Sequence, residues 1–276
     1  MNNKIDDLKK TARQLRLDVV KMVHCAGDGH PGPAMSAMDI IVALYFNVMK
    51  VDPNQPLWED RDRFILSKGH ACPALYAALA RRGYFSIDEF SGLRKLGCML
   101  QGHPTMQRTP GVDMTSGSLG NGLPIASGIA MAAKYKKKDY MTYVILGDGE
   151  IQEGVVWESA MFAKHHCLDN LIAFIDNNGW QSGFTVEECS GLLPIKEKWE
   201  AFGWHVQEID GHNYNQILEA IDIAKKYKGK PSMIIAHTIK GKGLDYMEND
   251  NSWHKRVPDE AQLARAIEIL GGSINE

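Results

Sequence analysis

The chain has 276 residues, of which 44% are hydrophobic and 24% charged, and its formal net charge is −3. This composition is ordinary for a globular protein and argues against disorder; at about 150 residues per domain, the length allows one large domain or two small ones. The balance of 31 basic against 34 acidic residues gives no electrostatic reason to expect nucleic acid or an anionic membrane as a partner. The N-terminal residues are polar and no segment approaches the roughly 20 apolar residues of a membrane span, so we expect a cytoplasmic protein.

Five cysteines, at positions 25, 72, 98, 167 and 189, are unevenly spaced, and none forms a CxxC pair. The odd count and irregular gaps indicate neither a disulfide framework nor a thiolate zinc site. We therefore expect small core residues in a reducing compartment.

The first part of the sequence predicts helices separated by loops. Apolar residues recur three or four positions apart in the first segment, as on a helix face: Ile5, Leu8, Ala12, Leu15, Val19 and Met22. The prolines and glycines of Gly29-His30-Pro31-Gly32-Pro33 predict a loop, followed by helices over about 36–48 and 73–82. A glycine-dense stretch over 111–128 precedes an alanine-rich helix that ends near Lys136-Lys137-Lys138, where cations suit the helix dipole.

The second part alternates short apolar runs with helical segments. The runs lie at 143–146, 171–175 and 232–236, and the helices at about 155–166, 194–202, 214–225 and 258–270. This alternation predicts βαβ units, a buried parallel sheet with helices on both faces, and ligands at the carboxyl ends of the strands. We expect one α/β domain over residues 1–276 with a helical N-terminal lead-in.

Two polar clusters follow neighbouring strands of this predicted sheet. Gly147-Asp148-Gly149 ends the first run and Asp176-Asn177-Asn178 ends the second, with 30 residues between Asp148 and Asn178, the length of one crossover. Their carboxylate and amide oxygens suit magnesium or calcium that shares a diphosphate, and a neighbouring helix N-terminus would supply amide donors to that anion. The alternative is that these residues only satisfy local turns.

Histidines form a second candidate cluster. His30, His70, His103 and His254 each lie in turn-like sequence, whereas His165 and His166 close a helix and are typical of surface residues. A single loop histidine is usually just solvated, but four of them favour a convergent site for proton transfer and anion contact.

The chain resembles the N-terminal, diphosphate-binding half of transketolase, as found where the enzyme is split between two subunits. The resemblance extends from the first helix to about Val257. Its motifs stand in the family's order: Gly29-His30-Pro31-Gly32, Ser67-Lys68-Gly69-His70-Ala71, Gln101-Gly102-His103-Pro104, Thr115-Ser116-Gly117-Ser118-Leu119-Gly120, Gly147-Asp148-Gly149 with Glu153-Gly154, Asp176-Asn177-Asn178, and Thr238-Ile239-Lys240-Gly241-Lys242-Gly243 followed by Trp253-His254.

The resemblance implies the thiamine diphosphate-binding (PP-type) fold and a site for that cofactor with Mg²⁺, or with Ca²⁺ or Mn²⁺. The implied metal ligands are Asp148, the Asn178 side chain and the Trp180 carbonyl. The implied cofactor contacts are His70, Gly149, Asn178 and His254 around the diphosphate, and Gly117 and Leu119 at the rings. The implied catalytic residues are His30 and His103 on the donor sugar, His254 in proton transfer, and Glu153 and Glu158 between paired active sites across the subunit interface.

The implied activity is transfer of a two-carbon ketol unit from a ketose phosphate to an aldose, as in pentose phosphate metabolism. The family's activating glutamate belongs to a pyrimidine-binding domain, so the resemblance implies a partner subunit that carries the pyrimidine-binding and C-terminal domains. We expect a heterotetramer that is active only when both subunits are present.

Two departures from the family pattern leave the sugar open. Many relatives carry a Gln-Ile-Asp-Gly-like turn where Ser182-Gly183-Phe184 follows Gln181 here, and many carry glycine in place of Lys255. A sulfonated or branched sugar phosphate is therefore an alternative substrate. Further alternatives are a non-catalytic cofactor-binding or regulatory subunit, or one subunit of a 2-oxoacid dehydrogenase.

Overall fold

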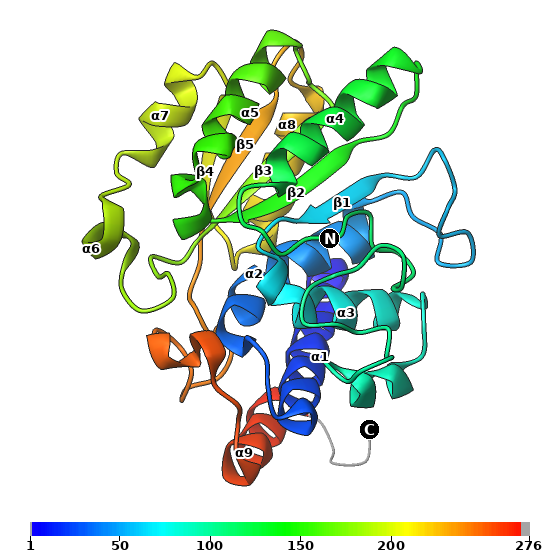
Figure 1. Ribbon diagram of the computed structural model, residues 1–276, viewed down its shortest axis with the longest axis vertical. Coiled ribbons are helices and arrows are strands. Elements are labelled where there is room, and N and C mark those ends of the chain that lie inside the picture. The colour runs from blue at the N-terminus through cyan, green and yellow to red at the C-terminus, as the bar shows by residue number, and fades with distance from the viewer. Residues whose placement is uncertain (1, 272–276) are drawn as a thin grey trace.

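The computed structural model describes residues 2–271, and its centre is a parallel sheet (Figure 1). The strands lie in the order β1 (Arg63–Leu66), β2 (Thr142–Gly147), β3 (Leu171–Asn177), β5 (Ser232–His237) and β4 (His205–Asp210). Every neighbouring pair is parallel. The α/β fold predicted from the alternation of apolar runs and helices is confirmed.

Helices cover both faces of this sheet and enclose two hydrophobic cores. One core joins alternate strand residues such as Val144 and Leu146 to α4 (Gly122–Tyr135), α5 (Gly154–His165) and α7 (Ile195–Ala201). The intervening residues, such as Tyr143 and Ile145, belong to the other core. That second core includes α8 (Tyr214–Lys226) and the N-terminal helices. Successive side chains of a strand point to opposite faces, so a strand covered on both faces reads as one apolar run.

The N-terminal helices pack together on one side of the sheet. They are α1 (Asn2–Ala26), α2 (Pro31–Ala43), which continues into a π-helical turn over Leu44–Val48, and α3 (Cys72–Arg82). All of α2 is buried, and the predicted stripe of α1 is buried from Leu8 to Met22. The last helix, α9 (Glu260–Leu270), lies against α1 (Figure 1). The predicted lead-in is therefore confirmed.

Two expectations from the sequence are wrong. The second helix begins at Pro31 rather than near residue 36, because Pro31 and Pro33 occupy its first turn, where the missing N–H is not needed. The cysteines are free as expected, but only Cys72 is a core residue. Cys98 is half-buried, and Cys25, Cys167 and Cys189 are exposed. The prediction that all five cysteines are core residues is therefore wrong for these four.

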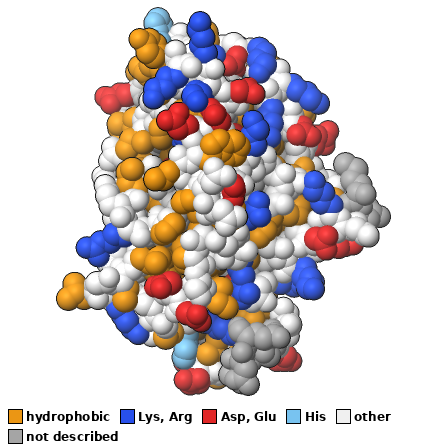
Figure 2. Space-filling view, turned by 90° about the vertical axis from the view of Figure 1, so that its right-hand side faces the viewer, with side chains coloured by type: hydrophobic (Ala, Val, Ile, Leu, Met, Phe, Trp, Pro, Cys, Tyr) orange, Lys and Arg blue, Asp and Glu red, His pale blue; other side chains and the backbone are white. Residues whose placement is uncertain are grey.

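The surface combines charged and hydrophobic side chains. On the face in Figure 2, hydrophobic side chains gather in patches between lysines, arginines and acidic residues. Among the helices that the structure describes, none is long and apolar enough to cross a membrane.

Candidate active site

The two polar clusters lie side by side at the carboxyl edge of the sheet. Strands β2 and β3 are neighbours, and Gly147 pairs with Asp176. A cavity of about 740 Å³ opens at this edge. It is lined by most of the residues singled out from the sequence: His30, His70, Gly117, Leu119, Asp148, Gly149, Glu153, Asn178, Trp180 and His254.

Asp148 is a buried carboxylate held by the backbone. Its Oδ1 accepts a hydrogen bond from Gly149 N at 2.8 Å and its Oδ2 accepts one from Gly179 N at 2.5 Å. Burial, and then the nearby charge of Asp176, raise the pKa of Asp148 to about 7. A carboxylate with a raised pKa is stabilised when a cation binds beside it.

Asn178 stands beside Asp148 with its amide oriented by neighbours. Its Nδ2 lies 3.4 Å from both Ser36 Oγ and Asp176 Oδ2, and its Oδ1 accepts a hydrogen bond from Trp180 N at 3.0 Å. Between residues 2 and 271 no three His, Cys, Asp or Glu side chains gather as a metal cluster. A metal ion at Asp148 and Asn178 would therefore need further oxygen ligands, such as backbone carbonyls or phosphates.

Behind these two residues lies a buried ion pair that the sequence reasoning did not assign to the site. Lys68 Nζ donates to Asp176 Oδ2, and Asp176 also accepts from Ser36 Oγ at 2.5 Å and from Thr238 Oγ1 at 2.5 Å. Although burial opposes ionisation, the charge of Lys68 keeps the pKa of Asp176 below its usual value. Lys68 also lines the cavity.

Three histidine rings that line the cavity converge on one another. The ring centroids of His30, His70 and His254 are 5.2–5.4 Å apart. Burial, followed by nearby cationic side chains, lowers the pKa of His30 to about 4 and that of His254 to about 3. Burial and the charge of Lys68 also lower the pKa of His70. These rings are therefore neutral at physiological pH and can accept or donate a proton.

Lys240 is the second cation of the cavity that sequence reasoning missed. Only 1% of this residue is exposed, and its Nζ lies 2.6 Å from Asn251 Oδ1 and 3.1 Å from His254 Nδ1. An ammonium group only donates, so Nδ1 of His254 accepts and the proton of the neutral ring is on Nε2. Burial, and then the charge of Lys68, lower the pKa of Lys240 to about 8.

Two residues implied by the resemblance do not line this cavity. His103 is exposed on a loop and lies close to Gly117, where an added Cβ would be 3.4 Å from its ring. Glu158 is exposed on the outer face of α5. Their implied roles toward a sugar and a second subunit remain proposals.

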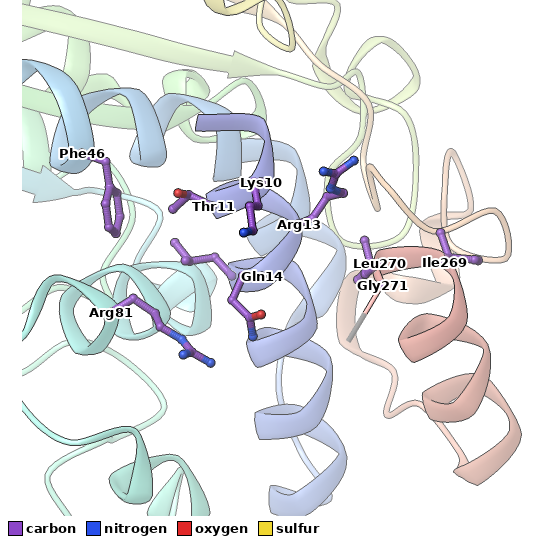
Figure 3. A pocket seen from close by; sticks show the side chains of 10 residues that line it. Lys10, Thr11, Arg13, Gln14, Phe46, Arg81, Ile269, Leu270 and Gly271 are labelled. Carbon is purple, nitrogen blue, oxygen red and sulfur yellow. The ribbon is translucent and has the colours of Figure 1, made fainter. Parts of the chain in front are cut away.

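A second hollow, of about 510 Å³, lies away from this edge (Figure 3). It is formed by Lys10, Thr11, Arg13 and Gln14 of α1, by Phe46 and Arg81, and by the end of α9 at Ile269, Leu270 and Gly271 (Figure 3). It contains none of the histidines or acidic residues described above. The chemistry therefore belongs to the cavity at the sheet edge.

The donor set of that cavity fits an anionic cofactor with a divalent metal. His30 Nδ1 is buried without a hydrogen-bond partner in the protein, and buried polar atoms of this kind usually meet a ligand or water. Lys68 and Lys240 offer positive charge for phosphate groups, and Asp148 and Asn178 offer oxygens for a metal. A diphosphate that shares its metal with the protein meets both requirements.

Comparisons with known proteins agree with this chemistry. Residues 7–275 match the family described as "Transketolase, thiamine diphosphate binding domain". The chain is 46% identical to the 6-deoxy-6-sulfo-D-fructose transketolase subunit SqwG of Clostridium sp. (strain MSTE9), with 96% of each chain covered. It is 40% identical to an apulose-4-phosphate transketolase subunit of Phocaeicola vulgatus, with 99% of this chain and 96% of that protein covered.

Among solved structures, transketolase from Campylobacter jejuni subsp. jejuni superposes with a TM-score of 0.92 at 35% identity. The match covers 98% of this chain and 43% of that one. The chain thus spans nearly all of the two subunits but less than half of the single-chain enzyme. It belongs to the family of transketolase thiamine diphosphate-binding domains, and the predicted family and fold are confirmed.

Proposed function

We propose that this chain is the N-terminal subunit of a two-subunit transketolase, which transfers a two-carbon ketol unit from a ketose phosphate to an aldose. The observation that carries the proposal is the cavity itself. It combines a metal-ligand pair, Asp148 and Asn178, with two buried lysines and three neutral histidines. Several neutral hydrogen-bonding side chains suit a polyhydroxylated sugar. The substrate of a 2-oxoacid dehydrogenase has fewer hydroxyl groups for them to bind, which argues against that alternative.

Thiamine diphosphate, when bound, would supply the nucleophilic carbon for the sugar carbonyl. Asp148, Asn178 and the Trp180 carbonyl would hold Mg²⁺, and Lys68, His70, Gly149, Lys240 and His254 would hold the diphosphate. Gly117 and Leu119 would contact the rings. The buried cations and the metal would neutralise the phosphates.

The histidines would handle the sugar. His30, with its unpartnered buried Nδ1, and His254, with its proton on Nε2, would bind hydroxyl groups and move a proton during transfer. His103 would join them from its exposed loop when the sugar is bound. The retention of these residues argues against a non-catalytic regulatory subunit.

The site also needs a partner. The pyrimidine-binding and C-terminal domains of the family would come from a second chain, and two copies of each would form a heterotetramer. Glu153 at the cavity mouth and Glu158 on α5 would lie where the two copies of this chain meet. The free cysteines agree with a cytoplasmic enzyme.

An unusual sugar is the second candidate substrate. Two subunits similar in length to this chain carry the names of a sulfonated fructose and of apulose 4-phosphate. In this chain Lys255 Nζ lies 3.7 Å from Asp28 Oδ1, and its charge contributes to lowering the pKa of the cavity residue His30. The resemblance to the family leads us to expect glycine at this position. A positive side chain at this place would favour a substrate with an anionic group distant from its carbonyl.

The first test is transfer from xylulose 5-phosphate to ribose 5-phosphate with thiamine diphosphate and Mg²⁺. It would be run on the chain alone and with a separately expressed second half. Activity only in the mixture supports a split transketolase, whereas full activity of the chain alone contradicts it. If the mixture assembles and binds cofactor but is inactive, the pentose phosphates are excluded as substrates, and a sulfonated or branched sugar phosphate becomes the proposed substrate.

A further inference from the structure

The segment that carries Lys240 is a non-helical connection after β5, residues 238–243, which we name the strap. Thr238 is fixed to the buried Asp176 and Lys240 O accepts a hydrogen bond from Asn249 N at 2.9 Å. Gly241 N donates to Gly32 O at 3.1 Å. The strap therefore connects the site to α2, and its position decides where the Lys240 ammonium group stands.

A polar cluster buried outside the cavity holds the strap from behind. Its centre is Asp39 of α2, which accepts hydrogen bonds from Arg16 at 2.7 and 3.2 Å, from His212 Nδ1 at 2.7 Å and from Tyr214 Oη at 3.0 Å. Arg16 Nε in turn donates to Lys242 O at 2.9 Å. Its side chains come from α1, from α2, and from the start of α8 together with the loop just before it, so the cluster joins three segments distant in sequence.

His212 is the link between this cluster and the strap. Its Nε2 lies 2.9 Å from Ile239 N, the residue immediately before Lys240. A backbone N–H only donates, so Nε2 must accept, and Nδ1 then carries the proton that is donated to Asp39. Both ring nitrogens are used, and each has one role. No other side chain has both a donor at the Nδ1 position and an acceptor at the Nε2 position.

We propose that His212 is a positioning residue for the active site: it fixes the Ile239 amide and thereby places Lys240 against His254 and the diphosphate. The proposal rests on the proposed function only in its last step, the contact of Lys240 with diphosphate. The network from Asp39 through His212 to the strap stands on the geometry alone.

A pair of variants separates positioning from general stability. In His212→Gln the amide oxygen reaches the Nε2 position and still accepts from Ile239 N. In His212→Asn the amide reaches only the Nδ1 position, so the Ile239 amide loses its partner. We expect amide hydrogen exchange over residues 238–243 of the full chain to become about tenfold faster in His212→Asn and to stay near the wild-type rate in His212→Gln.

The second readout is the Kd of thiamine diphosphate with Mg²⁺, measured by calorimetry on the assembled enzyme. We expect His212→Asn to raise this Kd about tenfold and His212→Gln to restore it, with His166→Asn on the surface as the matched control. If His212→Asn does not fold, His212→Leu replaces it, because leucine also lacks the acceptor.

Unchanged strap exchange in His212→Asn, or equal effects of the two variants on exchange, would overturn the proposal. Faster exchange with an unchanged Kd would also overturn it, because the strap would then not place Lys240 for the cofactor. If the wild-type assembly itself binds no thiamine diphosphate, the proposed function fails. The exchange measurement would still decide the role of His212 in holding the strap.

Discussion

The buried charged residues in and behind the cavity are of two kinds, those paired with an opposite charge and those that are not. Lys68 and Asp176 neutralise each other in an ion pair. Asp148 and Lys240 line the same cavity, and among the ion pairs of residues 2–271 neither has an oppositely charged partner within 4.0 Å. A buried charge without a counter-ion is costly and persists where a ligand supplies the counter-ion. The two residues thus mark where a cation and an anion bind.

Replacing Asp148 tests the metal site. In Asp148→Asn or Asp148→Ala we expect metal-dependent binding of thiamine diphosphate to weaken by at least about 100-fold, because a direct ligand is lost. The pKa of Asp148 is raised from 3.8 to about 7, so ionisation of this buried carboxyl lowers the stability of the fold as the pH rises between these two values. The thermal midpoint of the wild type should therefore fall over this pH range, and Asp148→Asn, which does not ionise, should lose this part of the pH dependence.

Calorimetry on the assembled enzyme measures the first effect, with the exposed Asp139→Asn as the control. Unchanged affinity would remove Asp148 from the metal role.

Replacing Lys240 tests the anion site through its pH dependence. Burial lowers the pKa of Lys240 to about 8, so the side chain loses its charge as the pH rises above this value. We expect the affinity for inorganic pyrophosphate to fall by up to about tenfold per pH unit above 8, since one proton is lost. Lys240→Arg stays charged and should lose this decline.

Isothermal titration calorimetry of the assembled enzyme at pH values from about 7 to about 9.5, which bracket that pKa, measures how the pyrophosphate affinity changes with pH in the wild type and in Lys240→Arg. The same slope in the two proteins would mean that another group titrates.

At the scale of elements, Glu150 joins the end of β2 to the beginning of α4. This buried carboxylate accepts hydrogen bonds from Ser67 Oγ, from Gly120 N at 2.8 Å and from Gly147 N at 2.9 Å. Sequence reasoning missed it, because a glutamate after Gly149 looks like any exposed residue of a turn. Its three partners lie just after β1, at the end of β2 and just before α4, at the edge of the sheet that carries the cavity.

We expect Glu150→Ala to lower the free energy of unfolding by about 3 kcal/mol, because two backbone amides and a hydroxyl lose their buried acceptor. Glu150→Gln keeps one acceptor oxygen and should lose less. Urea unfolding measures both changes. Glu158→Ala is the matched control on an exposed glutamate and should change stability by no more than about 0.5 kcal/mol. A loss of similar size in Glu158→Ala would contradict this account.

The strands predicted from the sequence are those buried on both faces. The strands at 143–146, 171–175 and 232–236 are continuous apolar runs, and each is confirmed as β2, β3 or β5. The edge strands β1 and β4 were missed. β1 has only four residues and begins with an arginine, and β4 is mostly half-exposed with polar residues, so neither has the apolar run of a central strand.

The candidate site was predicted where its residues stand in glycine- or histidine-containing motifs at strand ends. Lys68, Lys240 and Asp176 lay within quoted motifs, but the sequence gives no sign that a lysine in a loop is buried and turned inward. Their burial depends on contacts that local patterns do not contain, such as Asp176 with Ser36, Lys68 with Asp176 and Lys240 with Asn251. The buried Lys–Asp pair could have been suspected only from its position beside Asp148.

At the scale of the whole molecule, the outer faces of α4 and α5 expose several large apolar side chains. Large apolar side chains of these two packed helices are exposed: Ile125, Met131 and Tyr135 on α4, and Met161 and Phe162 on α5. Glu158 is exposed on α5 close to them in sequence. Leu119, at the cavity mouth just before α4, is also exposed. A second copy of this chain covering this face would bring the two cavities close to one interface.

This arrangement predicts which surface substitution prevents assembly. Met161 is 56% exposed on α5 and Ile223 is 42% exposed on α8, across the sheet. We expect Met161→Glu to separate the two copies of this chain within the proposed heterotetramer, because the new charge of each copy would be buried in the contact between them. Ile223→Glu should assemble normally. Sedimentation velocity over a range of concentrations measures the species present, and thermal unfolding confirms that both variants are folded. Equal assembly of the two variants would exclude the α4–α5 face as the interface, and dissociation by Ile223→Glu alone would assign that interface to α8.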